Sequence, residues 1–366
     1  MRRENAGCVL MCSETAVPAY TFLDVSGVGN SGKSAVVDVL REFEAIWAPE
    51  FSFEFDLLRA PGGLIELKTW LCDDWSPVRS HAAMRAFEEV IERMGVDPAW
   101  WNLPALLRSS SHRYDRRFQG HFLPLSRRFA TSFIVGRYCA EWSYDTLRES
   151  DVVRFVRKVL RRLGLRRAIL REVLLVDGAD FAERTTRYLR ELFAHAVPRD
   201  VAFIVLNNGL EPFNPVPALD MIRGARQLVV TRDPRDVYVS GQNLHSAAPQ
   251  DRALLASDND GLNKSFLATD DLELFVRRYR LYHQKLYRGS DSRVLHLRFE
   301  DLVCQYETTL ARIMQFVGVP PERHLRRQQC FSPVRSRANV GLWRRYGRAA
   351  EIDYIERELR PHLVES

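Results

Sequence analysis

The sequence predicts an α/β fold of three layers, with a central, mostly parallel sheet covered by helices and with a helical insertion. Two observations predict it: short apolar runs alternate with helical stretches along the 366 residues, and several runs end in Gly, Asn or Asp. Open α/β sheets bind their ligands at such strand ends. We expect strands at residues 20–25, 51–55, 172–176, 201–206, 227–231 and 293–297.

The chain divides into a short N-terminal tail and one large domain. We expect residues 1–19 to form the tail and residues 20–366 a single α/β domain. Between residues 73 and 171 the strand pattern fades, and we expect a helical insertion there that shapes an acceptor pocket. Within it, residues 151–163 place apolar side chains at helical spacing and basic side chains mostly on the remaining surface, which predicts a helix with a solvated basic face.

The composition is that of an ordinary globular protein, with 46% hydrophobic and 27% charged residues. The net charge of +6, from 53 basic and 47 acidic residues, is too small and too dispersed to predict nucleic-acid binding, and an anionic ligand is enough to explain it. The six cysteines form no CxxC pair and have no zinc-like spacing, so neither a disulfide framework nor a metal site is predicted.

The distribution of apolar residues gives an expectation about location. The first residues contain no sustained apolar segment, and no later run approaches the length of a membrane span. We therefore expect a cytoplasmic protein without a membrane partner.

A glycine-rich loop follows the first expected strand. Residues 27–34 have the sequence Gly-Val-Gly-Asn-Ser-Gly-Lys-Ser, which fits the pattern GxxxxGK[ST] between a strand and a helix. Such a loop turns successive backbone N–H groups inward and adds the positive end of a helix, so it holds a phosphate. The predicted cofactor-binding residues are Gly29, Asn30, Ser31, Gly32, Lys33, Ser34 and Ala35.

A second candidate anion site lies near residue 232. Residues 228–231 form an apolar run that leads directly into Arg232, and Ser240 follows two helical turns later. An arginine at a strand end and a serine at that spacing can converge on one phosphate.

The two motifs together resemble the paired signature of sulfotransferases that use 3′-phosphoadenosine 5′-phosphosulfate (PAPS). The resemblance implies a fold like that of P-loop NTPases, PAPS as the sulfuryl donor, and transfer to a hydroxyl or an amine. We expect no metal, because the sequence shows no metal-ligand cluster and the loop with Lys33 can hold the 5′-phosphosulfate. It further implies that the first motif holds the 5′-phosphosulfate and that Arg232 and Ser240 bind the 3′-phosphate. Because ATP has no 3′-phosphate, the second motif favours a sulfotransferase over a kinase.

Two later segments extend the resemblance. Residues 297–302 are similar to the family's strand-to-helix element, where Glu300 and Asp301 are expected to cap and brace the helix. Residues 336–343 are similar to the loop that covers the nucleotide in the family, which implies that Arg337 and Gly341 also reach the 3′-phosphate.

The sequence departs from the family at the basic residues that serve the leaving oxygen. Many sulfotransferases carry a lysine or arginine two residues before the second glycine of the loop, where this chain has Asn30. Many also carry a lysine before the second motif, where residues 206–209 are Leu-Asn-Asn-Gly. Lys33 is the best remaining cation, and Arg59 is the second choice.

Glu54 is the first candidate for the general base, and Asp56 is the second. Residues 51–56 alternate between aromatic and polar, so both carboxylates are expected on one face of a strand. Their position past the loop resembles that of the glutamate in carboxylate-using sulfotransferases, although a structural ion pair would use the same residues. Members with a histidine base make four further candidates: His81, His112, His121 and His245.

Two other classes share the phosphate loop. A kinase would place Lys33 on the outer phosphates, Ser34 on Mg²⁺ and Asp177 at the end of a Walker B strand, but it would leave Arg232 and Ser240 without a role. A GTP-dependent switch is disfavoured because residues 207–210 lack the aspartate that reads guanine. For a sulfotransferase we expect a small molecule or a glycan, rather than a protein, as acceptor.

Overall fold

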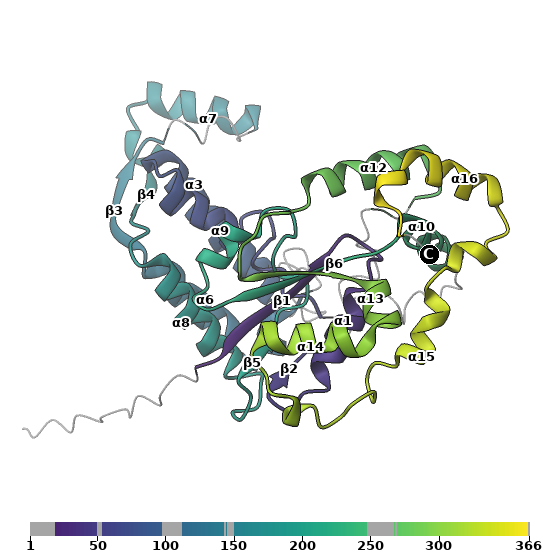
Figure 1. Cartoon of the computed structure of the whole chain (residues 1–366). Coiled ribbons are helices and arrows are strands. Elements are labelled where there is room, and N and C mark those ends of the chain that lie inside the picture. Colours follow the sequence, from purple (N-terminus) through teal and green to yellow (C-terminus); the bar gives the residue numbers. More distant parts are fainter. Residues whose placement is uncertain are drawn as a thin grey trace, which may run out of the picture.

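The computed structural model describes residues 19–49, 53–96, 112–142, 144, 150–246, 267 and 269–364. Its centre is a parallel sheet of five strands in the order β2-β5-β1-β6-β7 (Figure 1). The parallel sheet confirms the predicted fold class. The strands are β1 (Thr21–Gly27), β2 (Ile46–Trp47), β5 (Phe203–Val205), β6 (Arg226–Thr231) and β7 (Val294–Arg298).

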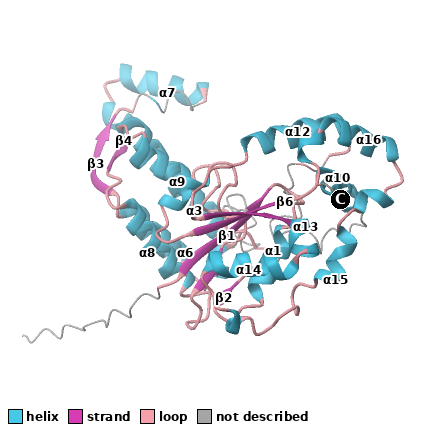
Figure 2. Ribbon diagram, viewed as in Figure 1, coloured by secondary structure: helices cyan, strands magenta, loops and turns pink. Residues whose placement is uncertain are grey.

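Helices bury both faces of this sheet, as Figure 2 shows. Side chains of β1 alternate between two cores, with Phe22 in one core and Leu23 and Val25 in the other. Residues 22–27 of β1 are all buried, as is typical of a parallel sheet that is covered on both faces.

Three groups of helices complete the layers. The core around Phe22 includes α3 (Pro77–Gly95), α6 (Phe122–Thr131) and α8 (Phe181–Phe193). The core around Leu23 includes α1 (Lys33–Arg41), α13 (Phe299–Cys304) and α14 (Tyr306–Val317). A third core joins β6 to α10 (Pro234–Ser246), α12 (Leu272–Lys285) and α16 (Ala349–Glu358). The shorter helices are α2 (Leu64–Lys68), α5 (Tyr114–Arg117), α9 (Pro215–Asp220) and α15 (Pro333–Ser336).

A separate antiparallel pair of strands projects from the body. It consists of β3 (Ile134–Ala140) and β4 (Arg171–Val176), and α7 (Asp151–Arg162) lies at its outer end (Figure 1). We call β3, α7 and β4 the arm. The helix predicted at residues 151–163 is confirmed as α7.

The arm corrects two predictions. The strand expected at residues 172–176 exists, but it pairs with β3 and is not part of the central sheet. The insertion expected to be helical contains β3, whose alternation is interrupted by Gly136 and Arg137. A run of four apolar residues, 173–176, looks the same in either sheet, and its partner decides where it lies.

The strand expected at residues 51–55 is also corrected for the described residues 53–55, which are not a strand. Their backbone is held partly by side chains: Asn207 donates to the Phe53 carbonyl at 2.7 Å, and the Tyr114 hydroxyl donates to the Glu54 carbonyl at 3.0 Å. These bonds replace part of a regular strand ladder. Residues 51 and 52 lie outside the described ranges.

Candidate functional site

The phosphate loop connects β1 to α1 and depends on two glycines. Gly32 has a left-handed φ of 87°, and a Cβ atom there would lie 2.4 Å from Cδ2 of Phe299. A Cβ atom on Gly27 would lie 2.4 Å from the Val230 carbonyl oxygen on the neighbouring strand. Close packing against β6 and α13 therefore fixes the path of the loop.

The loop offers hydrogen-bond donors to an anion. Helix α1 begins at Lys33, and no side chain of the described residues caps it. Ser31 is only 3% exposed, and neither its hydroxyl nor the Asn30 Nδ2 has a hydrogen-bond partner within the described ranges. Buried donors of this kind are costly unless a ligand or water satisfies them, so these residues fit a bound phosphate or phosphosulfate.

Arg232 joins the phosphate loop to two distant segments. Its guanidinium donates to the Asn30 carbonyl at 3.2 Å and to the Asn339 carbonyl at 2.6 Å, and it lies 4.8 Å from the centre of the Phe299 ring. The side chain is 7% exposed, and burial lowers the pKa of Arg232. Among the described residues its Nε has no partner, so one charge-assisted donor is left for a ligand.

Asp236 anchors residues 336–343, which we call the late loop, to α10. It accepts hydrogen bonds from the Gly341 N–H at 2.8 Å and from the Trp343 N–H at 3.2 Å, and burial raises the pKa of Asp236. Gly341 has a φ of 72°, which suits glycine. The Gly341 N–H is therefore used within the protein.

The other predicted 3′-phosphate residues lie on these same segments. Ser240 is half-buried on α10, two turns after Arg232, and Arg337 is exposed next to Asn339. Glu300 accepts the Asp233 N–H at 2.8 Å just before α10 begins, whereas no described side chain caps α13, the helix that Glu300 and Asp301 were expected to cap. The structure thus brings the first motif, the second motif and the late loop together at Arg232.

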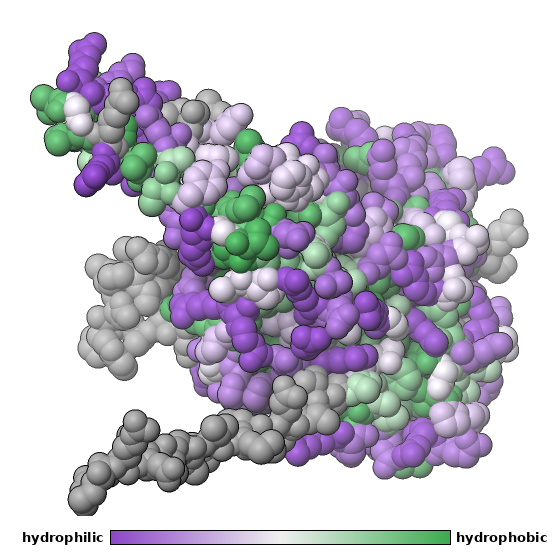
Figure 3. All heavy atoms as spheres, turned by 90° about the vertical axis from the view of Figure 1, so that its left-hand side faces the viewer, coloured by the Kyte–Doolittle hydropathy of each residue, from purple (hydrophilic) through white to green (hydrophobic). Residues whose placement is uncertain are grey.

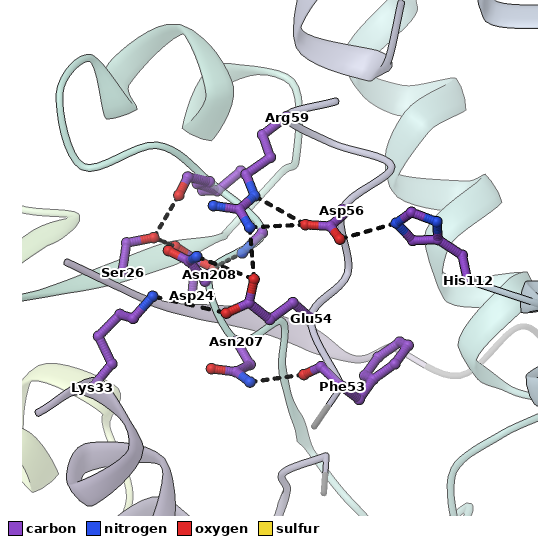
Figure 4. A network of polar contacts seen from close by, with 12 residues as sticks. Asp24, Ser26, Lys33, Phe53, Glu54, Asp56, Arg59, His112, Asn207 and Asn208 are labelled. Carbon is purple, nitrogen blue, oxygen red and sulfur yellow. Dashed lines mark hydrogen bonds and ion pairs between the residues drawn. The ribbon is translucent and has the colours of Figure 1, made fainter. Parts of the chain in front are cut away.

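Glu54 lies between two cations at the carboxyl end of the sheet (Figure 4). Its Oε2 is 2.6 Å from Arg59 Nη2 and accepts from Asn208 Nδ2 at 3.3 Å, while its Oε1 is 3.9 Å from Lys33 Nζ. Burial lowers the pKa of Lys33, and the Glu54 carboxylate opposes this shift. The phosphate loop and the candidate base are therefore in direct electrostatic contact through Lys33.

Asp56 faces away from Lys33 and contacts the insertion. It is 6% exposed, pairs with Arg59 at 2.8 Å, and lies 3.1 Å from His112 Nε2. Tyr114 accepts the Asp56 N–H at 2.9 Å and donates to the Glu54 carbonyl. His112 and Tyr114 both belong to the insertion, so that region positions the segment that carries Glu54.

Three polar residues of the site were missed as site residues at the sequence level. Asn207 and Asn208 have left-handed φ values of 45° and 62° and hold the backbone of Phe53 and the side chain of Glu54. Asp24, buried within β1, accepts the Gly209 N–H at 2.7 Å and the Gln227 Nε2 at 3.0 Å, and burial raises the pKa of Asp24. An aspartate inside an apolar run and an Asn-Asn-Gly turn at a strand end were the available signals.

The other candidate histidines lie elsewhere, or their side chains are not described. His81 is buried in α3 and accepts the Leu174 N–H at 3.0 Å, and His121 stacks on His195 with ring centres 3.6 Å apart. His245 lies in the last turn of α10, where the side chains are outside the described set. Of the four candidates, only His112 contacts the Glu54–Asp56 segment among the described side chains.

The kinase alternative loses its Walker B strand. Asp177 follows β4, which belongs to the arm and not to the central sheet, and its Oδ1 accepts the Ala179 N–H at 3.0 Å. The geometry thus defines an α/β protein with a glycine-rich loop of the phosphate-binding type, a second candidate anion site and a carboxylate beside them.

Comparisons with known proteins agree with this class. A model of the sulfotransferase family matches residues 217–323, which include the second motif and β7. These residues thus match the sulfotransferase family, and the resemblance inferred from the motifs is confirmed. No curated protein matches the sequence.

Several solved structures are similar to the chain, among them structures named as sulfotransferases. The sulfotransferase domain of the Synechococcus PCC 7002 olefin synthase is 14% identical, with 95% of this chain and 96% of that chain covered and a TM-score of 0.41. A sulfotransferase from Mycobacterium avium is 14% identical, with 95% and 78% covered and a TM-score of 0.34. Retinol dehydratase in complex with androsterone and inactive cofactor PAP is 16% identical, with 96% and 83% covered and a TM-score of 0.33.

No helix of the described ranges is both long and apolar enough to cross a membrane. The same residues contain no group of three or more His, Cys, Asp or Glu side chains suited to a metal ion.

Proposed function

We propose that the chain transfers a sulfuryl group from PAPS to a hydroxyl or amine of a small molecule or glycan, with Glu54 as general base. The family match supports sulfuryl transfer in general. The observation that carries the PAPS assignment is the position of Arg232, which is buried, bonded to the phosphate loop and left with one unpartnered donor among the described residues. A 3′-phosphate requires a cation at a second site beside the loop.

The residues present fit this donor. The backbone of the loop, Ser31, Lys33 and Ser34 would hold the 5′-phosphosulfate. Arg232 and Ser240 would hold the 3′-phosphate, with Arg337 near the same surface. The Gly341 N–H would contact the 3′-phosphate only if it lost its hydrogen bond to Asp236.

Glu54 is placed to move a proton. Arg59 and Asn208 hold its Oε2, and we assign proton removal to Oε1 because this oxygen lies nearer to Lys33 and the phosphate loop. Lys33 then places positive charge where negative charge develops on the nucleotide. Many sulfotransferases use a basic residue at the position of Asn30 for this role, but Asn30 is uncharged. PAPS supplies the sulfuryl group and leaves as the 3′,5′-bisphosphate when the acceptor oxygen or nitrogen bonds to sulfur.

The proposal is tested by nucleotide selectivity and by transfer. Adenosine 3′,5′-bisphosphate should raise the unfolding temperature without Mg²⁺ and more than 5′-AMP does, because only the bisphosphate occupies both anion sites. Protection by ATP with Mg²⁺ alone would contradict the proposal. Incubation with sulfur-labelled PAPS and pools of small acceptors or glycans should label an acceptor, and the transfer should persist in EDTA.

A further inference from the structure

The apolar face of α7 is exposed. Val152, Phe155 and Leu163 are 71%, 67% and 66% exposed, and Val156 and Val159 of the same face are exposed as well. Their spacing places them along one side of a helix that is about 18 Å long. Side chains of this size are normally buried against another part of the chain.

The opposite, cationic face of α7 contains contacts between this helix and the rest of the molecule. Arg157 is only 5% exposed, and Arg161 pairs with Glu141, which follows β3. The helix is thus turned with its apolar face outward. In Figure 3 the lobe that projects at the upper left shows hydrophobic and hydrophilic atoms side by side at its surface.

Positive charge is concentrated around this helix. Residues 150–171 contain eight basic residues and one acidic residue, Asp151, which gives a net charge of +7. Since the whole chain has a net charge of +6, the remainder carries −1. The eight basic residues are Arg154, Arg157, Lys158, Arg161, Arg162, Arg166, Arg167 and Arg171.

We infer that α7 docks the protein on the surface of an anionic lipid bilayer. A helix with one apolar face and one basic face lies in the plane of such a surface, with the apolar side chains among the acyl chains and the basic ones at the headgroups. Lys158 and Arg162 flank Phe155 on the helix surface and are both exposed, so they can reach headgroups from the inserted face.

Charge complementarity selects the bilayer over other occupants. A symmetric contact between two copies through α7 would bring two segments of +7 together and would be repulsive. A nucleic acid would use the charge but not the exposed valines, phenylalanine and leucine. This docking replaces the expectation of no membrane partner, and it is independent of the proposed reaction.

The experiment is co-sedimentation of the full chain with vesicles. Vesicles of equal parts phosphatidylcholine and phosphatidylglycerol should bind the protein, vesicles of phosphatidylcholine alone should bind it much less, and added salt should weaken the binding. Replacing Phe155 and Leu163 by Gln should weaken binding on the order of tenfold or more. Replacing Lys158 and Arg162 by Gln should weaken it about fivefold for each charge removed.

Matched variants keep the test specific. Leu325→Gln with Val334→Gln removes two exposed apolar side chains outside the arm, and Arg277→Gln with Arg360→Gln removes two exposed charges. Both pairs should bind vesicles as the wild type does. Because the altered side chains are exposed, all variants should unfold at the wild-type temperature, which separates lost docking from lost folding.

Three results would overturn the inference. The first is failure of the wild-type protein to bind anionic vesicles, and the second is unchanged binding after Phe155 and Leu163 are replaced. The third is a dimer in sedimentation velocity that depends on Phe155 and Leu163, in a protein that does not bind vesicles. The last result would assign the face to a second copy of the chain.

Discussion

The nucleotide end of the body and the arm use arginine and apolar residues in opposite ways. At the nucleotide end, Arg232 and Arg235 are buried and bonded to neighbouring segments, and Phe299 packs beneath the loop. On the arm, Phe155 and its neighbours face outward while Arg157 is buried. The nucleotide end is held in place by contacts within the chain, whereas the exposed face of the arm indicates a partner outside it.

The largest effect is expected on turnover, which should depend on Glu54 in the body of the protein and not on Phe155 in the arm. Glu54→Gln keeps the shape of the side chain but removes the base, so turnover should fall about 10²–10⁴-fold, measured with labelled PAPS and an identified acceptor. Phe155→Gln should leave turnover on a soluble acceptor unchanged.

Asp56→Asn is the comparison for Glu54, because it loses the ion pair to Arg59 and alters the contact with His112 on the far side of the same segment. It should lower stability more than turnover per folded molecule. Abolished turnover in Asp56→Asn together with a nearly silent Glu54→Gln would reassign the base.

A second prediction tests whether the buried arginine of the body selects the nucleotide. Arg232→Ala should weaken binding of adenosine 3′,5′-bisphosphate by about 1.5–3 kcal/mol and leave 5′-AMP nearly unaffected, as measured by calorimetric titration. Arg235→Ala is the matched control. Its partners are Asp233 and Glu356, so it should cost stability without favouring one nucleotide. Equal losses for both nucleotides in Arg232→Ala would remove the 3′-phosphate assignment.

A third prediction concerns acid. His283 is buried in α12 and stacks on Tyr279 with ring centres 4.0 Å apart, and burial, with His362 and Arg288 nearby, lowers the pKa of His283 to about 3. Below about pH 6.5, the pKa of a histidine in the unfolded chain, the unfolded state binds a proton at this residue and the folded state does not. The free energy of unfolding therefore falls as the pH falls. Between pH 7 and pH 5 the loss from this group should be about 2 kcal/mol by urea denaturation.

His283→Phe should keep the stacking and remove that part of the pH dependence. His121→Phe, at the exposed histidine that precedes α6, should leave it in place. The same acid-induced loss in His283→Phe as in the wild type would contradict the assignment.

The smallest effect is expected on the arm. Phe155→Ala, in buffer without lipid, should change the free energy of unfolding by less than about 0.5 kcal/mol, because the ring is exposed. Phe87→Ala, at a fully buried ring of α3, should cost about 3–5 kcal/mol. A large cost for Phe155→Ala would show that α7 packs its apolar face within the protein.

Local patterns explain what the sequence could predict. The loop at residues 27–34 and the turn at Arg232 each combine a strand end, fixed spacing and a helix start within a dozen residues. The parallel sheet followed from apolar runs separated by helical stretches. Such signals need no knowledge of distant contacts.

The rest depended on residues far apart in the chain. Asn208 reaches Glu54 across 154 positions, and Asn207 reaches Phe53 across the same separation, so a segment with a strand-like pattern is held as a loop. The run at residues 172–176 pairs with β3 and therefore lies outside the central sheet. Neither outcome is encoded by spacing within one segment.

The hydroxyl of Tyr114 bonds the backbone of the segment that carries the candidate base, at Glu54 and at Asp56, across 60 and 58 positions. The turn of the phosphate loop, in contrast, closes between neighbours, with Ser31 N–H on the Val28 carbonyl. Contacts between distant positions pay a larger loop-closure entropy and form later during folding. We therefore expect the local turn of the phosphate loop to form earlier during folding than the contacts that place Glu54, which require the insertion to dock.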